Sequence, residues 1–438
     1  MLSIWIRNLL YLLAFCLAIP WLVVRRLRTG RYRQGWAEKL WGAASQPPPA
    51  GSPASPTIWL HGVSVGEIQL LNPLRQELQA VWPNARFVVS TTTQSGMELA
   101  RKLLPPAVRT LYFPLDFSWA VHRTFRSLQP DLLVLGELEL WPNLLAIAQR
   151  ADVPVVVVNG RLSARSSAGY RRFRWLTRGM FASLRLVCAQ SELYADRFRQ
   201  CGTDARVTVV SGSMKFDNAS LNSSSTEVQQ LRALVGVQER HTVFMAGSTQ
   251  VEDEQAAITA FLHCRQEAPE LRLVVVPRHP HRFDAVAQSL QSLPAKVLRR
   301  SELTTAVQAT DWDILLVDTV GELSHWWGLA TVALVGGSFG KRGGQNMIEP
   351  AAYGANVAFG PNTSNFRDVV ELLLDDDAAI QLPSQESVST WLAEQLTNPQ
   401  AGQQRGQRAR QLVIAQQGAM AKTVQLLQTL PLPHRGAW

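Results

Sequence analysis

The chain has 438 residues, of which 46% are hydrophobic and 18% are charged, and it carries a formal charge of +9. This length exceeds the usual size of one hydrophobic core, so a chain of this ordinary globular composition is predicted to form two domains. The four cysteines lie far apart without a Cys-x-x-Cys pair, which argues against a secreted disulfide scaffold and a structural zinc site, while the positive charge indicates an anionic partner such as nucleic acid, a membrane surface or a phosphorylated substrate.

The N-terminal segment, residues 1–41, is predicted to be a membrane anchor with a basic juxtamembrane end. Residues 8–24 are apolar and aromatic apart from Asn8, which is barely enough to cross a hydrocarbon core of roughly 30 Å and also suits a shallow insertion. The basic residues that follow are Arg25, Arg26, Arg28, Arg31 and Arg33. By the positive-inside rule they place the rest of the chain on the cytoplasmic side. A cleaved signal peptide is the competing interpretation, but the apolar run continues through Pro20 to Val24 without a small-x-small cleavage site.

Polar segments divide the rest of the chain. Residues 42–56 are rich in Pro, Ser, Gly and Ala and form a predicted flexible spacer. The serine-rich stretch 218–230 is the predicted linker between an N-terminal domain, 57–217, and a C-terminal domain, 231–402. Residues 403–438 are predicted to be a closing helix and a tail.

Short apolar runs alternate with helical stretches in both domains. In the first domain the predicted strands are 58–60, 87–90, 132–135, 155–158, 186–188 and 207–210. In the second domain they are 243–246, 273–276, 314–317, 332–335 and 357–359. Because near-continuous apolar runs suit strands that are buried on both faces, each domain is predicted to hold a parallel sheet covered by helices. The predicted fold class is α/β, with two Rossmann-like domains that face each other across a cleft and bind ligands at their strand ends.

Two acidic motifs follow predicted strands of the first domain. Residues 59–67, Trp-Leu-His-Gly-Val-Ser-Val-Gly-Glu, predict a strand, a glycine turn and a helix start that puts Glu67 at the mouth of the cleft. The helix dipole is expected to keep Glu67 ionised, so that it could take a proton from an attacking hydroxyl; alternatively, it only caps the helix. Glu137 and Glu139 lie in the loop before Pro142, which suits a first helical turn. One of them could orient the acceptor or the base, or both are ordinary loop acids.

A basic and aromatic stretch without acidic residues lies between Asp152 and Glu192. Its arginines are Arg161, Arg165, Arg171, Arg172, Arg174, Arg178 and Arg185. Tyr170, Phe173 and Trp175 are interleaved with them, which suits a membrane-facing surface that receives an acidic lipid. Since no recognised nucleic-acid module accompanies the charge, nucleic acid is not predicted as a partner.

Residues 335–354 form a glycine-rich stretch, Val-Gly-Gly-Ser-Phe-Gly-Lys-Arg-Gly-Gly-Gln-Asn-Met-Ile-Glu-Pro-Ala-Ala-Tyr-Gly. It predicts a strand, a glycine loop that lets the backbone approach a ligand, and a helix start whose amides favour negative charge. Asn346 and Glu349 could bond sugar hydroxyls, so a nucleotide sugar fits this design. The stretch matches neither the dinucleotide Gly-x-Gly-x-x-Gly pattern nor a Walker loop. Alternatively, the glycines only shape a tight strand-to-helix turn.

Together with further motifs in the same order, these segments resemble the 3-deoxy-D-manno-octulosonic acid (Kdo) transferases that add Kdo to lipid A. The further motifs are Gly160-Arg161-Leu162-Ser163, Gly212-Ser213-Met214-Lys215-Phe216-Asp217, Gly247-Ser248-Thr249, Val276-Pro277-Arg278-His279-Pro280 and Asp318-Thr319-Val320-Gly321-Glu322-Leu323. The match runs from the anchor to about Asp368. The resemblance implies a GT-B fold, CMP-Kdo as donor, a lipid A precursor (lipid IVA) as acceptor, an inverting mechanism at the cytoplasmic face of the inner membrane, and no required metal or other cofactor.

The resemblance also implies roles for individual residues. By matching motif, Glu67 is similar to the family's proton acceptor, and Glu137 and Lys215 are similar to its transition-state stabilisers. The implied CMP contacts are Arg278, His279, Thr319, Val320, Gly321, Asn346, Met347, Ile348 and Glu349. These roles agree with the chemistry, because an oxocarbenium-like centre develops beside the Kdo carboxylate while CMP leaves as an anion, so both signs of charge need partners.

The chain departs from the family pattern at three positions. Gln250 and Gln345 stand where histidines are expected, and His281 stands where a glutamate is common. His279 and His281 form a His-x-His pair, but no third ligand cluster accompanies them, so no metal site is predicted. Two other functions stay open: another GT-B nucleotide-sugar enzyme, such as a soluble epimerase, and a lipid-surface binding protein that keeps the fold without catalysis.

Overall fold

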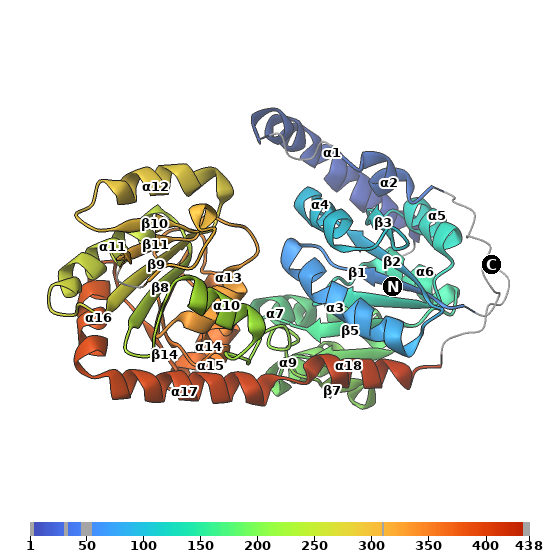
Figure 1. Ribbon diagram of the computed structural model, residues 1–438. Coiled ribbons are helices and arrows are strands. Elements are labelled where there is room, and N and C mark those ends of the chain that lie inside the picture. The colour runs from blue at the N-terminus through green and yellow to red at the C-terminus, as the bar shows by residue number, and fades with distance from the viewer. Residues whose placement is uncertain (1–3, 30–33, 45–54, 309–310, 432–438) are drawn as a thin grey trace. The chain divides into compact units, whose positions relative to one another are not determined.

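The structure is a computed structural model, and it describes four stretches of the chain: 4–29, 34–44, 55–308 and 311–431. Most of the predicted spacer, 42–56, lies outside the described residues, as do Arg31 and Arg33 of the predicted basic cluster. Figure 1 shows the order of the elements along the chain.

The chain forms two compact units. The first contains the residues up to Asp217 together with those from Gln417 onward, and the second is Asn218–Gln416. Within the described residues, each unit holds one seven-stranded sheet whose neighbouring strands pair in parallel. The two parallel sheets confirm the predicted α/β class.

The sheet of the first unit has the strand order β3-β2-β1-β4-β5-β6-β7. Its strands are β1 (Thr57–His61), β2 (Arg86–Thr91), β3 (Arg109–Tyr112), β4 (Leu132–Gly136), β5 (Val155–Gly160), β6 (Leu186–Ala189) and β7 (Thr208–Val210). In the central register Leu60 lies opposite Val89 of β2 on one side and Val134 of β4 on the other. The predicted central runs are therefore neighbours in the sheet.

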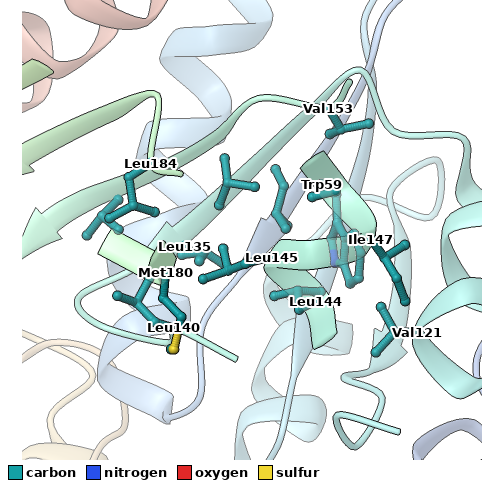
Figure 2. Close-up of a cluster of buried hydrophobic side chains, with 14 of the residues drawn as sticks. Trp59, Val121, Leu135, Leu140, Leu144, Leu145, Ile147, Val153, Met180 and Leu184 are labelled. Carbon is teal, nitrogen blue, oxygen red and sulfur yellow. The ribbon is translucent and has the colours of Figure 1, made fainter. Parts of the chain in front are cut away.

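Helices cover both faces of this sheet. Successive residues of each strand point to opposite faces and therefore belong to two different hydrophobic cores. Trp59 and Leu135 belong to one core, shown in Figure 2, while Leu60 and Val134 belong to the other. The first core includes α5 (Ser118–Leu128), α6 (Pro142–Arg150), α8 (Arg174–Ala182) and α9 (Glu192–Cys201). The second core includes α3 (Val65–Val81), α4 (Gln94–Leu103) and α18 (Ala419–Gln428). Burial on both faces explains why these strands are continuously apolar.

The sheet of the second unit has the strand order β10-β11-β9-β8-β12-β13-β14. Its strands are β8 (Thr242–Thr249), β9 (Leu271–Pro277), β10 (Val297–Arg299), β11 (Ile314–Leu316), β12 (Val332–Val335), β13 (Asn356–Phe359) and β14 (Ala379–Gln381). One core of this unit includes α11 (Val251–Arg265), α12 (Phe283–Gln291) and α16 (Ser387–Thr397). The remaining helices of the second unit are α10 (Thr226–Leu234), α13 (Leu323–Trp326), α14 (Ile348–Ala352), α15 (Arg367–Asp375) and α17 (Pro399–Gln416).

Three strands lie outside the sequence prediction: β3, β10 and β14. Each stands at an edge of its sheet. Edge strands have one neighbour and lie partly in solvent, so their residues include polar ones, as in the Arg-Thr-Leu-Tyr of β3, and they lack an apolar run.

The C-terminal region contains two helices where the sequence predicts one closing helix from residue 403. α17 ends at Gln416 and α18 begins at Ala419, because Gly418 between them has a φ of +97°, outside helical geometry. The side chain of Asp217 accepts bonds from the main-chain N–H groups of Gly418 and Met420, which fixes the start of α18 on the first unit. The predicted single helix is therefore wrong at this point.

The apolar N-terminal segment forms α1 (Ile4–Thr29), which is long and apolar enough to cross a membrane. Its first half is bonded to the first unit. The Arg7 guanidinium donates to the carbonyl oxygen of Pro142 (2.9 Å), while Asn8 bonds to Ser118 and to the Asn143 side chain. Further along, the Phe15 ring packs on Phe117 and on Trp36 of α2 (Trp36–Trp41). The large apolar side chains exposed on α1 include Trp5, Leu9, Leu13, Leu17, Trp21 and Leu27.

Candidate functional site

In the first sheet the strand order reverses between β1 and β4. In the second it reverses between β8 and β12, and again at the edge, where β11 lies between β9 and β10. In open parallel sheets, ligands bind outside the carboxyl ends of the strands at such a switch point. Glu67 follows β1 and Glu137 follows β4, so both lie at the switch point of the first sheet. In the second sheet the glycine-rich stretch follows β12, whereas Arg278 and His279 follow β9 and the loop Thr319–Gly321 follows β11.

Glu67 is held by the start of α3. The Ser64 side chain is the N-cap of this helix, and its hydroxyl donates to Oε1 of Glu67 (2.8 Å). The main-chain N–H of Val63 donates to the other carboxylate oxygen (2.8 Å). The Ser64 hydroxyl also accepts from the main-chain N–H of Glu67 (3.4 Å), so the glutamate at the third helical position bonds back to the turn, in an arrangement related to a capping box but with Val63 as the main-chain donor. The capping interpretation of Glu67 is therefore correct, and it fixes the orientation of the carboxylate.

The same carboxylate also lines a small pocket. Gly136, the last residue of β4, lies against this carboxylate, and a Cβ atom there would be tight only against the carbonyl oxygen of His61, at 3.2 Å. The pocket has a volume of about 10 Å³, close to that of one water molecule. It is lined by Glu67, Leu70, Leu71, Gly136, Glu137, Val158, Asn159 and Met214. Glu67 therefore both bonds to the start of its helix and lines a pocket the size of one water molecule.

Burial raises the pKa of Glu67 above its ordinary value, with the charge of Glu137 adding to the rise, against the hydrogen bonds from Val63 and Ser64. Burial thus acts against the ionised form that the helix dipole was expected to favour. Burial likewise raises the pKa of Glu139 to about 6, and the charges of Glu67 and Glu137 contribute. Carboxylates with raised pKa values are suited to accept a proton near neutral pH.

Glu137 and Lys215 form an ion pair beside Glu67, with 4.0 Å between Nζ of Lys215 and Oε1 of Glu137. Glu137 has a φ of +56°, an uncommon conformation for a residue other than glycine, and it follows the last residue of β4 directly. Lys215 lies beyond β7, in the segment that ends at Asp217. The structure therefore brings together the three residues that the sequence assigned to catalysis.

Asn159 is a residue of this pocket that the sequence did not indicate. It lies near the end of β5, is 1% exposed and has a φ of +53°. A run of four valines followed by Asn-Gly predicts a buried strand and its end, and nothing in that pattern marks the asparagine as a pocket residue.

Arginines and exposed aromatic rings follow one another in residues 171–175, and Trp141 is a further exposed ring. We call this set the acceptor face, and it consists of Trp141, Arg171, Arg172, Phe173, Arg174 and Trp175. The Trp141 indole donates to Oε2 of Glu139 (3.0 Å), and Trp175, at the start of α8, is 76% exposed. Tyr170, in α7 (Ala164–Arg172), instead packs on Phe181, and the charge of Glu139 contributes to raising its pKa, after burial. The acceptor face thus adjoins the loop of Glu137 and Glu139.

In the second unit, Asp253 fixes the glycine-rich stretch. Its Oδ2 atom accepts from the main-chain N–H groups of Gly337 (2.7 Å) and Gln250 (2.8 Å). Gly336 permits this approach, because a Cβ atom there would lie 2.6 Å from the carbonyl oxygen of Ser248. The two glutamines that replace expected histidines lie here: Gln250 caps α11, and the Gln345 amide lies beside Gly337.

The implied contacts at the end of the glycine-rich stretch differ in exposure. The Asn346 side chain donates to Oε1 of Glu349 (3.0 Å), and burial raises the pKa of Glu349. Met347 and Ile348 are buried, with exposed fractions of 0% and 1% for the whole residue, so neither is open to a ligand in this structure. The helix that follows, α14, has only five residues and is too short for a strong dipole. Polar side chains, rather than a long helix, therefore define this end of the stretch.

The loop Thr319–Gly321 is held at both ends by carboxylates. Asp318 accepts from the Arg299 guanidinium (2.7 Å) and from Ser301. Glu322 accepts from the Thr319 hydroxyl (2.6 Å), so that hydroxyl is already bonded within the protein. Val320 between them is exposed. Arg278, which follows β9, is also exposed, and the His279 ring stacks on His281 with centroids 5.3 Å apart. These groups leave backbone and cationic side chains open to an anionic ligand.

Solved structures with a similar fold support the GT-B class. The chain aligns with MurG of Acinetobacter baumannii at a TM-score of 0.56 and 12% identity, covering 86% of this chain and 100% of that one. It aligns with the UDP-GlcNAc 2-epimerase of Neisseria meningitidis at a TM-score of 0.56 and 12% identity, covering 85% and 100%. At this identity the likeness concerns the fold alone. The fold and its two switch-point sites define a protein of the GT-B class.

Sequence relatives identify the family. Residues 31–218 match the family described as 3-deoxy-D-manno-octulosonic-acid transferase (kdotransferase). The chain is 32% identical over 418 residues to the 3-deoxy-D-manno-octulosonic acid transferase of Bordetella pertussis, covering 93% of this chain and 95% of that one. It is 30% identical over 405 residues to the enzyme of the same name from Haemophilus influenzae, covering 92% of each. The chain belongs to the 3-deoxy-D-manno-octulosonic acid transferase family, a family of glycosyltransferases.

Proposed function

We propose that this protein transfers Kdo from CMP-Kdo to a hydroxyl group of a lipid A precursor, lipid IVA, with inversion at the anomeric carbon, in lipopolysaccharide inner-core synthesis. The observation that carries the proposal is the cluster of Glu67, Glu137 and Lys215 at the switch point of the first sheet, in a chain of this family. The cluster contains the Glu67 carboxylate, whose pKa is raised, together with a second carboxylate, Glu137, and the ammonium group of Lys215.

The chemistry assigns one task to each charge. The acceptor hydroxyl gives its proton to Glu67 while its oxygen bonds to the anomeric carbon of Kdo, and the bond from that carbon to the phosphate oxygen breaks, with the electron pair leaving on CMP. Glu137 stabilises the positive charge that develops on the sugar, and Lys215 stabilises negative charge beside it. The raised pKa of Glu67 supports the base role, because a stronger base accepts the proton more readily.

The donor is assigned to the second unit. Arg278 and His279 supply cationic or polar groups for the phosphate of CMP, and the loop Thr319–Gly321 supplies backbone. Asn346 and Glu349 bond the nucleoside, and the buried Met347 and Ile348 between them hold the segment in place. Gln250 and Gln345 supply amide groups where histidines are expected, which changes the charge but keeps hydrogen-bond donors.

The acceptor is assigned to the acceptor face and to a membrane in which α1 is embedded. The arginines of that face match the phosphates of a lipid A precursor, and its exposed rings suit the boundary between headgroups and hydrocarbon. Arg25, Arg26 and Arg28 at the end of α1 favour the cytoplasmic leaflet. The acceptor lipid and the first unit then meet at the cytoplasmic surface of the membrane.

The direct test is to incubate the detergent-solubilised protein with tetraacylated lipid A precursor and CMP-Kdo and to follow the mass of the lipid. We expect mass increases that correspond to added Kdo residues. An unchanged lipid together with conversion of soluble sugar nucleotides would instead indicate an epimerase-like GT-B enzyme. Lipid binding without any change in either substrate would indicate a binding protein without catalysis.

A further inference from the structure

The carboxyl end of β5 contains a β-bulge next to the catalytic cluster. Val157 pairs with Val187 of β6, and Gly160 pairs with Ala189, so Val158 and Asn159 together stand opposite a single residue. Asn159 adopts a φ of +53°, which asparagine tolerates better than most residues. Bulges near active sites redirect a side chain that a regular strand would aim elsewhere.

Hydrogen bonds fix which way the Asn159 amide faces. Its Oδ1 atom accepts from the main-chain N–H of Met214 (3.1 Å), and its carbonyl oxygen accepts from the Gln190 side chain (2.9 Å). Since only an oxygen can accept from an N–H, Nδ2 must lie on the other side of the amide. This Nδ2 atom is buried and has no hydrogen-bond partner among the residues that the structure describes. Buried donors of this kind are rare and require an explanation.

The pocket supplies that explanation. Asn159 lines it together with Glu67 and Glu137, and its volume of about 10 Å³ holds one oxygen atom but no sugar ring. Two of its polar lining residues are carboxylates, which accept hydrogen bonds when ionised. The Asn159 amide adds donors to the same wall, so an oxygen in the pocket could donate to one side and accept from the other.

We propose that Asn159 is a further polar residue of the reaction site, and that its side-chain N–H group donates a hydrogen bond to the oxygen of the attacking hydroxyl. The hydroxyl proton points to Glu67, one lone pair of its oxygen accepts from Asn159, and the other lone pair attacks the anomeric carbon. The inference rests on the proposed function, since it assigns an acceptor alcohol to the pocket. Asn159 thereby orients the nucleophile and takes no proton itself.

Asn159 also has a structural task, which the test must separate from this one. The bond from Met214 to Oδ1 holds the residue that precedes Lys215, so removal of the whole side chain would disturb the ion pair of Lys215 as well. The substitution Asn159→Asp keeps an oxygen for Met214 and replaces the donor with a carboxylate oxygen. Gln190→Ala is the matched control, because it removes a bond to the Asn159 main chain and leaves the side-chain donor in place.

The experiment measures lipid-linked Kdo formation and its pH dependence in wild type, Asn159→Asp, Asn159→Ala and Gln190→Ala. For Asn159→Asp we expect turnover to fall about tenfold or more, with unchanged affinity for CMP-Kdo. We also expect the acidic limb of its pH profile to move to higher pH, because a third negative charge raises the pKa of Glu67. A purely structural role would lower the thermal midpoint without moving that limb.

Two results would overturn the inference alone: an active wild type alongside an Asn159→Asp variant with turnover within about twofold and an unmoved acidic limb, or an Asn159→Ala variant that loses no more activity than Gln190→Ala. A wild-type protein that adds no Kdo to the lipid would overturn the proposed function, and the inference with it. The wild-type measurement therefore distinguishes the two failures.

Discussion

Glu67 and Asp253 occupy the same position in the two units. Each is the third residue of the helix that follows the first strand of its sheet, α3 after β1 and α11 after β8. Each accepts a hydrogen bond from the turn before the helix. The two acids differ in which group follows the neighbouring strand of the sheet. The loop after β12 offers Asp253 the N–H of Gly337, whereas the residue after β4 brings a second carboxylate, Glu137, near Glu67.

The comparison shows that the local motif does not decide the role of the acid. Asp253 is fully buried and bonded across the switch point, so it braces the loop that is assigned to the donor. Burial raises the pKa of both acids, and for Glu67 the charge of Glu137 adds to the rise. Glu67 differs in that it faces a pocket beside that second acid, which is the position that the proposed base role requires. Both units thus place an acid at the third position of a helix, one bonded across the switch point and one lining a pocket.

The largest effect is expected for Glu67→Gln. Glutamine also serves in capping boxes, so the fold should persist, but it cannot accept a proton. We expect transfer to fall by about 10²- to 10⁴-fold, with CMP-Kdo affinity and thermal midpoint close to wild type. Turnover with purified acceptor, calorimetric binding of CMP-Kdo and thermal unfolding measure these quantities. Near-normal turnover would remove Glu67 from the base role.

Asp253→Ala should show the opposite pattern. It leaves the N–H groups of Gly337 and Gln250 without their acceptor, which lowers the free energy of unfolding by about 1–3 kcal/mol. We expect weaker CMP-Kdo binding and largely preserved turnover at saturating donor. Denaturant unfolding and donor titration check this, with Glu267→Ala, an exposed acid just beyond α11, as the control. Loss of turnover with intact donor binding would show that Asp253 takes part in the chemistry.

The pH dependence of the transfer rate tests the role proposed for Glu67 and the influence of Glu137 on it. Because the pKa of Glu67 is raised, the transfer rate should fall with decreasing pH at a midpoint above the ordinary glutamate value. Glu137→Gln removes a negative charge that contributes to this rise, so the midpoint of the remaining activity should move to lower pH, by up to about one unit. The profile of kcat/KM against pH reports this shift. A move to higher pH would contradict the assignment.

The smallest effect is expected at the acceptor face. Replacing Arg171, Arg172 and Arg174 together by Ser should raise the KM for lipid acceptor several-fold and leave the KM for CMP-Kdo unchanged. The arginines attract phosphorylated lipid, and added salt should shrink the difference from wild type. Arg150→Ser, at the far end of α6, is the control. Equal losses for both substrates would indicate misfolding instead.

The sequence predicted the central strands of each sheet and the edge strand β7, and it missed the other three edge strands. Central strands such as β4 and β5 are buried on both faces and therefore apolar throughout, which a sequence pattern reveals directly. The edge strands β3, β10 and β14 mix polar and apolar residues and are three or four residues long. Their place depends on pairing with a neighbour, which is a property of the assembled sheet rather than of the segment.

The candidate site was predictable where a motif specifies it. Glu67, Glu137 and Lys215 come from motifs of the family, and the structure adds their proximity and the rise in the pKa of Glu67. Asn159 was not predictable, because its role depends on a bulge and on the Met214 N–H, a contact from a segment 55 residues later in the chain. Long-range contacts of this kind leave no local signal.

The bonding of α1 to the first unit limits how that helix can meet a bilayer. Arg7 and Asn8 are held against the globular unit, and Phe15 packs on Trp36, where the chain has already returned from the end of the helix. Beyond Phe15 the helix rises about 21 Å at ~1.5 Å per residue, less than the roughly 30 Å of a hydrocarbon core. The part of α1 that extends beyond these contacts is therefore shorter than a hydrocarbon core.

The same half of α1 bonds to Pro142 and Asn143, at the start of the helix that follows the Glu137 loop. If α1 is the membrane anchor proposed above, these bonds link its position in the lipid to the position of the pocket, so we expect the distance from the headgroups to the pocket to follow the depth of α1.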